Sequence, residues 1–408
     1  MAHEMEALER NVRLYPWYAS AFNAFFWMPV FFLYFNERFP LENVLRLEAI
    51  YYIAVVFFEV PSGYFSDSFG RRITLIVSSA ALVTAYALFF FGIGFALFAA
   101  AQICLAAGIS FSSGTDTSFH FDSLAALGRE KEFADREAGI ARNIFLAGAG
   151  AAIAGGFVAV FQLRLAYGLS FLAALTAFFI AICTAEPTTH ERKNVLGFGF
   201  SGQIKECLRS LRTPSLGWLF GYAVIMTVLN HVPYEFYQAY LGLLTLDLNL
   251  WTKSTPVVTG LHMGVAMLFG AWFASQSIRF RDWLGNVPSL LVGTLVQTVI
   301  ITLMAFLLNP ILAVLLLFRT FPRALMIAPL NAAVAPQVPQ AQRATYLSLQ
   351  SLAGRLSFAG VLFMLSLVAG SDNPTDWPSL SLILRLCSGI SLVGLLALAV
   401  TASIRRAT

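Results

Sequence analysis

Residues 63–72 read Gly63-Tyr64-Phe65-Ser66-Asp67-Ser68-Phe69-Gly70-Arg71-Arg72, a short charged turn between two long apolar stretches. The rest of the chain avoids charge: of 408 residues, 58% are hydrophobic and only 12% are charged. The mean hydropathy is +0.73, well outside the range of soluble globular domains. We therefore expect most of the chain to lie in lipid and the turn to lie at a polar surface.

A helix needs about 20 apolar residues to cross a bilayer, and polar breaks divide the chain into twelve such segments. They lie near residues 14–35, 44–64, 72–92, 95–118, 140–161, 166–184, 216–241, 254–276, 287–308, 311–335, 345–369 and 379–402. With the N-terminus inside, 18 of the 26 lysines and arginines fall in inner segments and four in outer loops. Basic residues mark the cytoplasmic side, so we expect a multi-pass protein of the plasma (bacterial inner) membrane with both termini cytoplasmic.

The longest polar break divides six spans from six. We expect an N-terminal six-helix bundle in residues 1–185, a cytoplasmic linker with an amphipathic helix in 186–214, and a C-terminal bundle in 215–408. Between spans eight and nine, Arg279-Phe280-Arg281-Asp282-Trp283-Leu284-Gly285 partly repeats the opening turn. The predicted fold is an all-α membrane protein with twelve transmembrane helices in two six-helix pseudo-repeats.

The opening turn has the pattern Gly-x-x-x-Asp-x-x-Gly-Arg-Arg, and it resembles the signature loop between the second and third helices of the major facilitator superfamily of transporters. Phe111–Leu124, with Ser-Gly-x-Asp and a later Asp-Ser-Leu, is similar to a stretch in many bacterial twelve-helix members, as is Arg343-Ala344-Thr345. The resemblance spans essentially the whole chain. It implies a secondary active transporter working by alternating access, with an inner gate that includes Asp67 and Arg71.

The residue types in the turn suit such a gate. Gly63 would let the end of span two approach a neighbouring helix closely, and Asp67 could accept hydrogen bonds from the amides of a helix N-terminus. Asp122 either pairs with an arginine at the inner mouth, Arg71 or Arg142, or is a solvated helix end. The predicted inner-gate residues are Gly63, Asp67, Gly70, Arg71, Arg72, Asp122 and Arg142.

Two departures from the family's drug-antiporter pattern argue against drug:proton antiport. Cys104 stands four residues before Gly108, where the antiporter signature has arginine, and Ala151–Gly156 lacks the proline of span five. Efflux of a drug or lipid-like amphiphile stays an alternative, and a non-transporting membrane sensor or enzyme on the same scaffold is a second one. The sequence contains no convergent catalytic set and no nucleotide-binding Gly-x-x-x-x-Gly-Lys-Ser/Thr loop. We therefore expect a transporter that is not an enzyme, without a cofactor, driven by an ion gradient.

Ionisable groups inside spans are the default functional hypotheses, because each costs roughly 2.5–3.5 kcal/mol at the bilayer centre. The resemblance implies that spans one, four, seven and ten surround a central cavity. Arg319 and Arg323, one turn apart in span ten, can bind carboxylate or phosphate bidentately, so we expect a small organic anion as solute. The predicted substrate-binding residues are Arg319, Arg323, Asp116, Asn23, Asn230, Tyr234 and Gln238.

The expected coupling ion is H+, which needs a group whose pKa can be drawn toward neutrality. The candidates are Glu59, Asp116, Glu235 and His231. No metal site is expected, since the four scattered cysteines form no close pair and His262 beside Met263 fits core packing better. The expected partners are the solute, H+ and membrane lipids, with no nucleic acid, and the protein is expected to be a monomer.

Overall fold

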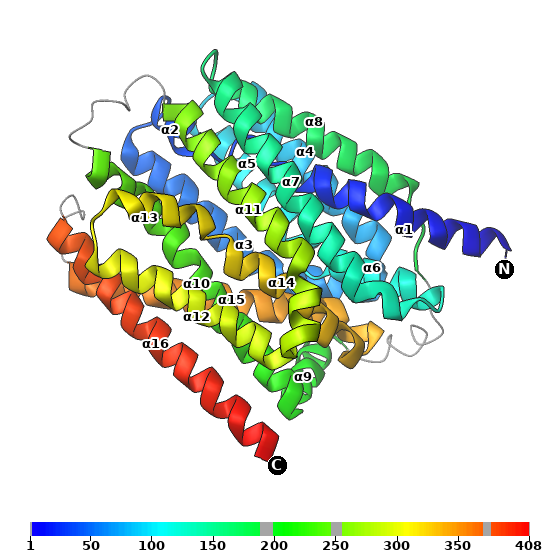
Figure 1. Ribbon diagram of the computed structural model, residues 1–408. Coiled ribbons are helices and arrows are strands. Elements are labelled where there is room, and N and C mark those ends of the chain that lie inside the picture. Colours follow the sequence, from blue (N-terminus) through cyan, green and yellow to red (C-terminus); the bar gives the residue numbers. More distant parts are fainter. Residues whose placement is uncertain (1, 188–198, 246–254, 370–376, 408) are drawn as a thin grey trace.

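The computed structural model describes residues 2–187, 199–245, 255–369 and 377–407. In these residues the chain forms helices and no strands. Figure 1 shows long helices that run along one common axis, with both termini toward the same end of the bundle. We call this end the terminal end and the opposite one the far end. The all-α membrane fold predicted from the sequence is confirmed.

In the described residues, nine α-helices lie before residue 211, and the others follow it. The first group is α1 (Ala2–Phe22), α2 (Phe31–Asn36), α3 (Leu41–Phe69), α4 (Arg71–Phe91), α5 (Phe95–Ser112), α6 (Thr115–Ala126), α7 (Phe133–Ala159), α8 (Arg164–Cys183) and the linker helix α9 (Phe200–Ser210). The second group is α10 (Pro214–Thr245), α11 (Thr255–Leu284), α12 (Asn286–Phe306), α13 (Pro310–Leu315), α14 (Phe321–Val334), α15 (Arg343–Ala369) and α16 (Trp377–Ala407). Short 3-10 segments are η1 (Glu130–Glu132), η3 (Leu316–Phe318), η4 (Ala335–Gln337) and η5 (Gln340–Gln342).

The buried apolar side chains form two large cores. One draws only on residues 15–181, and the other only on residues 207–402. Because burial of apolar surface drives helix packing in each, the helices before and after the linker are two bundles with separate interiors. We call them the N half and the C half.

Ten helical segments among the described residues are long and apolar enough to cross a membrane. The expected spans at 14–35 and 44–64 are not among them. The first is not one helix, because α1 ends at Phe22 and α2 starts at Phe31, after a turn with Pro29, whose ring removes a backbone donor. The second is α3, which carries Glu48 and Glu59 within the expected span.

Spans four and ten are also interrupted, which the hydropathy pattern does not reveal. Span four breaks at Gly114, whose φ of 74° is in the left-handed region, and restarts as α6. Span ten passes through η3 before α14 begins. These breaks place Asp116 in the first turn of α6 and Arg323 in the first turn of α14, so both charges lie near helix N-termini.

The partial sequence repeat is also a structural repeat. Gly70 joins α3 to α4 with φ 123° and ψ 150°, and Gly285 joins α11 to α12 with φ 94° and ψ 156°. A side chain is strained in this conformation, which explains why glycine stands at both positions. The two halves thus share a turn geometry, although the arginines after Gly70 have no counterpart after Gly285.

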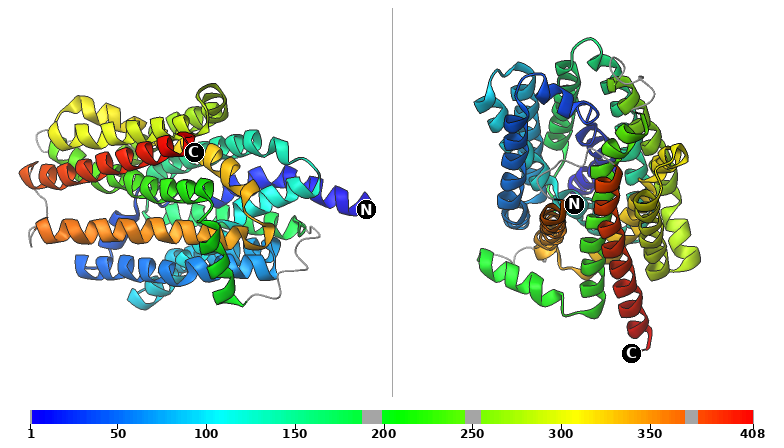
Figure 2. Two further views of the ribbon diagram at one scale, coloured as in Figure 1. Left: turned by 90° about the horizontal axis from the view of Figure 1, so that it is seen from below. Right: turned by 90° about the vertical axis from the view of Figure 1, so that its left-hand side faces the viewer.

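The two halves meet mainly where α7 contacts α11 and where α3 contacts α15, and α14 also contacts α7. Helix α7 packs against α11 through small side chains, among them Ala141, Ala271 and Ala274. Helix α3 packs against α15, and the left view of Figure 2 shows these blue and orange helices side by side. Small residues allow close contact between membrane helices.

Candidate gate and binding site

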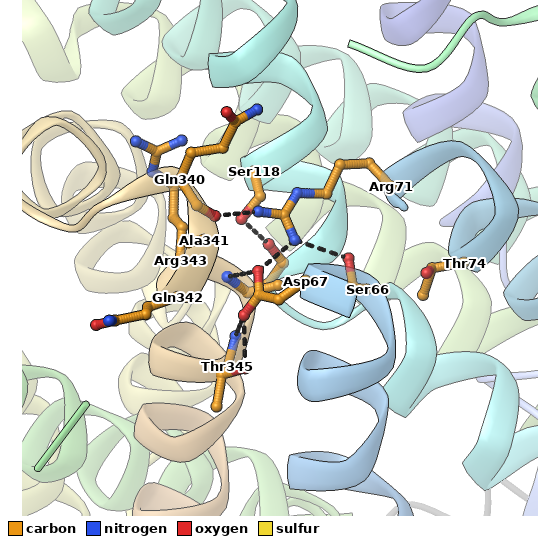
Figure 3. A network of polar contacts seen from close by, with 12 residues as sticks. Ser66, Asp67, Arg71, Thr74, Ser118, Gln340, Ala341, Gln342, Arg343 and Thr345 are labelled. Carbon is orange, nitrogen blue, oxygen red and sulfur yellow. Dashed lines mark hydrogen bonds and ion pairs between the residues drawn. The ribbon is translucent and has the colours of Figure 1, made fainter. Parts of the chain in front are cut away.

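A buried polar network joins the two halves at the terminal end (Figure 3). Asp67, at the end of α3, accepts hydrogen bonds from the backbone amides of Ala344 at 3.2 Å and Thr345 at 2.9 Å. The Thr345 hydroxyl also donates to Asp67, at 2.5 Å. These donors form the N-terminus of α15, where the helix dipole favours a negative charge. Asp67 of the N half therefore caps a helix of the C half, the arrangement expected from the sequence.

Two arginines complete the network, one from each half. Arg71 donates to Asp67, to Asp122 Oδ2 at 3.1 Å and to the Gln340 carbonyl at 2.5 Å. Arg343 binds Asp122 and donates to two carbonyl oxygens of its own half, which fixes its guanidinium. All four charged side chains are almost fully buried. In so dry a site each charge depends strongly on its partners, and loss of one partner is costly.

The linker helix α9 takes part in the same network. Gln203 Nε2 donates to Asp67 Oδ2 at 2.8 Å and to Thr345 Oγ1 at 2.8 Å. On the same helix face, Cys207 is fully buried, and burial raises the pKa of its thiol to about 12, so it stays neutral. Helix α9 thus spans the seam between the two halves.

Five of the seven predicted gate residues lie together: Gly63, Asp67, Gly70, Arg71 and Asp122. Arg72 lies beside them and donates to the carbonyls of Thr184 and Ile182 at the end of α8. Arg142 does not join the network, because its side chain is exposed and contacts Asn143. Arg343 takes the place expected for Arg142. The motif Arg343-Ala344-Thr345 is visible in the sequence, but no local pattern there indicates that Arg343 pairs with Asp122.

Gly63 makes the contact between α3 and α15 possible. A Cβ at this position would lie 2.7 Å from Ser348 Oγ and 2.8 Å from the Ala344 carbonyl oxygen. Since the second atom belongs to the backbone, α15 would have to move.

We expect Gly63→Ala to lower the stability of the purified protein by about 1–3 kcal/mol, the usual cost of overpacking. Thermal unfolding in detergent measures this. Gly150→Ala in α7, where a Cβ meets nothing within 4 Å, is the matched control and should leave the midpoint unchanged. Equal midpoints for both variants would contradict the close approach.

The two arginines predicted to bind substrate differ in their surroundings. Arg323 is exposed, and no hydrogen bond or ion pair formed among the described residues involves it. Tyr234 and Arg355 lie within its electrostatic range. Arg319 lies over the Tyr237 ring, 4.5 Å from its centroid, and its Nη1 is 3.4 Å from His262 Nδ1. Neither arginine is paired with a described carboxylate.

Asp116 lies elsewhere, in the N half. Its electrostatic neighbours are Glu137 and the tyrosines of α1, Tyr15 and Tyr18, rather than the two arginines. Its Oδ1 accepts from the Thr117 amide at 2.6 Å. The structure therefore does not bring Asp116 and Arg323 into contact.

Glu59 forms the main charged contact between α3 and α15 deeper in the bundle. Its Oε2 is 4.0 Å from Arg355 Nε, and its Oε1 accepts from the Ser113 hydroxyl at 2.6 Å. The Glu59 carboxylate is fully buried. It thus joins the halves electrostatically, without a direct hydrogen bond to the arginine.

The other predicted residues lie just after the end of α1 and along α10. Asn23 follows α1 and donates to the Ala19 carbonyl of that helix at 2.8 Å, and Asn230 donates to Met326 Sδ at 3.6 Å. His231 Nδ1 is 2.6 Å from the Thr227 carbonyl oxygen. Tyr234 and Glu235 are exposed. The side chain of Gln238 lies outside the described part of the chain.

A further polar group, not predicted from the sequence, lies between the halves. His120 and Glu137 are buried against each other, and Asn331 of α14 donates to Glu137. His120 follows Asp116 by four residues, and this spacing in the sequence predicts that both lie on one face of a helix. Glu137 lies outside the expected span at 140–161, because α7 begins earlier, at Phe133.

Comparisons with known proteins agree with this fold. Residues 41–361 match the family model of the Major Facilitator Superfamily, whereas no curated protein matches by sequence. The crystal structure of the human organic anion transporter TETRAN is similar, with a TM-score of 0.70, 17% identity, and coverage of 96% of this chain and 99% of that chain.

Two bacterial structures are also similar. One is a bacterial homologue of the iron transporter ferroportin in an outward-facing state, with a TM-score of 0.64 and 16% identity. The match covers 97% of this chain and 99% of the homologue's chain. The structure of the Escherichia coli fucose:proton symporter has a TM-score of 0.64 and 14% identity. The match covers 97% of this chain and 98% of the symporter chain. At these identities the likeness shows the fold alone. The family match over most of the chain shows that this protein belongs to the Major Facilitator Superfamily of transporters.

Proposed function

We propose that this transporter moves a small organic anion across the plasma membrane by alternating access, coupled to protons, with both termini in the cytoplasm. In this proposal residues 1–185 and 215–408 rock as two bundles about a site between them, and a monomer suffices. The network of Asp67, Arg71, Asp122 and Arg343 is the inner gate. It holds the terminal end shut and must break for that end to open.

The exposure of Arg323 and its lack of a described carboxylate partner support an anionic solute. The residue is exposed, although its helix α14 contacts α7 of the N half and three helices of the C half. It has no carboxylate partner within the described residues. A charge within a membrane bundle is retained only where water, a partner or a ligand reaches it. An anion would supply the missing partner.

The backbone of α14 supports the same solute class. Arg323 lies in the first turn of this helix, where the dipole also favours a negative charge. Arg319, about one turn earlier, adds a second cation. The organic anion transporter with the same fold is consistent with this proposal, although at 17% identity it does not carry it.

Untargeted comparison of metabolites inside and outside cells, with and without the protein, tests the proposal. An anion whose distribution depends on the protein, and on the proton gradient, is the expected result. A broad resistance phenotype with no anion moved would favour efflux of amphiphiles instead. Proteoliposomes that bind a solute but never accumulate it would indicate a sensor.

A further inference from the structure

The linker helix α9 lies at the terminal end (Figure 1) and contacts both α3 and α15. On its buried face, Gln203 Nε2 is 2.8 Å from Asp67 Oδ2 and 2.8 Å from Thr345 Oγ1. It is also 3.0 Å from the Ala341 carbonyl oxygen. A carboxylate and a backbone carbonyl can only accept hydrogen bonds, so these partners fix the orientation of the amide. Gln203 therefore acts as a donor toward the seam between the halves.

This donor completes a set of groups that binds the Asp67 carboxylate. Helix α15 supplies the backbone amides of Ala344 and Thr345 and the Thr345 hydroxyl. Gln203 adds a fourth donor, and it shares the Oδ2 atom with both Thr345 groups. Because the carboxylate is charged and buried, each of these hydrogen bonds is charge-assisted. Among the four donors, only Gln203 lies outside α15, on the linker.

Helix α9 is anchored to the C half. Cys207 is fully buried and belongs to the apolar core of the C half, and Leu211 packs against the same core shortly before α10 begins at Pro214. On the other side, the Phe200 ring meets Tyr64 of α3 with centroids 5.3 Å apart, but Phe200 is still 41% exposed. When the halves separate, α9 should therefore stay with the C half and leave α3.

We propose that Gln203 is a positioning residue of the inner gate, through which α9 acts as a latch. It holds the Asp67 carboxylate on the N-terminus of α15 while the terminal end is closed. This rests on the proposed alternating access and inner gate. Each opening of the terminal end breaks the hydrogen bond between Gln203 and Asp67 and separates Phe200 from Tyr64. The linker thus helps to set the ratio of closed to open protein, in addition to joining the halves covalently.

Spin-label distances in the purified full-length protein show which half α9 follows. One label is placed on Ser201→Cys in α9, and the second on Lys131→Cys in η1 of the N half or on Arg279→Cys in α11 of the C half. All three positions are exposed, and Cys104 and Cys183 are replaced by Ser.

Asp67→Asn weakens the gate and should populate the open state. In this variant the distance between positions 201 and 131 should lengthen, whereas the distance between positions 201 and 279 should stay the same. The opposite pattern would show that α9 follows the N half, and it would overturn the latch.

Gln203→Met keeps the length of the side chain and removes the donor. The ratio of closed to open protein, measured with the labels at positions 201 and 131, should fall about tenfold, as expected for loss of a charge-assisted hydrogen bond. In the Asp67→Asn background the same substitution should lower the ratio only about threefold, because a neutral hydrogen bond is about half as strong. A residue with a merely structural role would give the same factor in both backgrounds.

Lys205→Met is the matched control, because it places the same new side chain on the exposed face of α9. It should leave the ratio unchanged. If Gln203→Met fails to fold, Gln203→Asn shortens the side chain by one methylene and should also lower the ratio about tenfold. An unchanged ratio in the Gln203 variants, or an equal factor in both backgrounds, would overturn the latch.

The same measurements separate the latch from the proposed function. An effect of Asp67→Asn without an effect of the Gln203 variants would remove the latch and leave the gate in place. If neither substitution changes the ratio, the inner gate falls as well. If the Gln203 variants respond as expected but the protein moves no solute, the latch stands and the transport proposal falls.

Discussion

Asp67→Asn shifts the protein by about a hundredfold away from the state in which the halves are joined at the terminal end. The carboxylate of Asp67 accepts from Arg71, from two amides of α15, and from Gln203. An amide of the same size cannot accept from all of them and leaves Arg71 with Asp122 as its remaining carboxylate partner. Breaking a buried ion pair costs about 3 kcal/mol or more, which is a factor of about 10² in the ratio of closed to open protein.

Spin-label distances in the purified protein measure this ratio directly. The labels are placed on Lys131→Cys in η1 and Arg212→Cys before α10, both exposed, after replacement of Cys104 and Cys183 by Ser. Asp282→Asn is the matched control: it alters the aspartate of the repeated turn, which is 62% exposed and, within the described part of the chain, is paired only with its neighbour Arg281. The control should leave the distance distribution unchanged. A distribution for Asp67→Asn equal to that of the wild type would show that the network does not hold the terminal end closed.

The contrast between Asp67 and Asp282 explains what the sequence can and cannot predict. The two glycine turns were predictable, because Gly70 and Gly285 follow their aspartates at the same spacing and adopt the same backbone conformation. The network was only half predictable. Asp67 and Arg71 belong to one short motif, but Arg343 meets Asp122 across 221 positions of sequence, and no local pattern encodes such a contact.

The same reasoning applies to the interrupted helices. Hydropathy averages over about 20 residues, so it predicts where a span lies but not that Gly114 breaks it. Because of that break, Asp116 lies in the first turn of a new helix, α6. The following turn then brings His120 to Glu137. A buried pair between two helices depends on such packing, and it could not be read from either segment alone.

Arg323→Gln weakens binding of the transported anion by about 10- to 100-fold, the equivalent of the 1.5–3 kcal/mol that a hydrogen bond to a charged group contributes. The guanidinium has no described carboxylate to lose, so its removal should act on the ligand rather than on the fold. Arg323→Lys keeps the charge but not the planar fork of donors, so its affinity should lie between those of the wild type and Arg323→Gln. Arg319→Gln should have a smaller effect, since that guanidinium already contacts Tyr237 and His262.

Equilibrium binding to the purified variants, with the anion found in the metabolite comparison, measures these differences. Arg385→Gln is the matched control: it removes the same charge from α16, where the guanidinium lies over the Phe306 ring, 5.3 Å from its centroid. It should bind like the wild type, which separates a local contact from a general loss of positive charge. If Arg323→Gln and Arg319→Gln both keep wild-type affinity and transport, the cations of span ten do not bind the solute. Water alone would then solvate the exposed Arg323, and the anionic substrate class would fall.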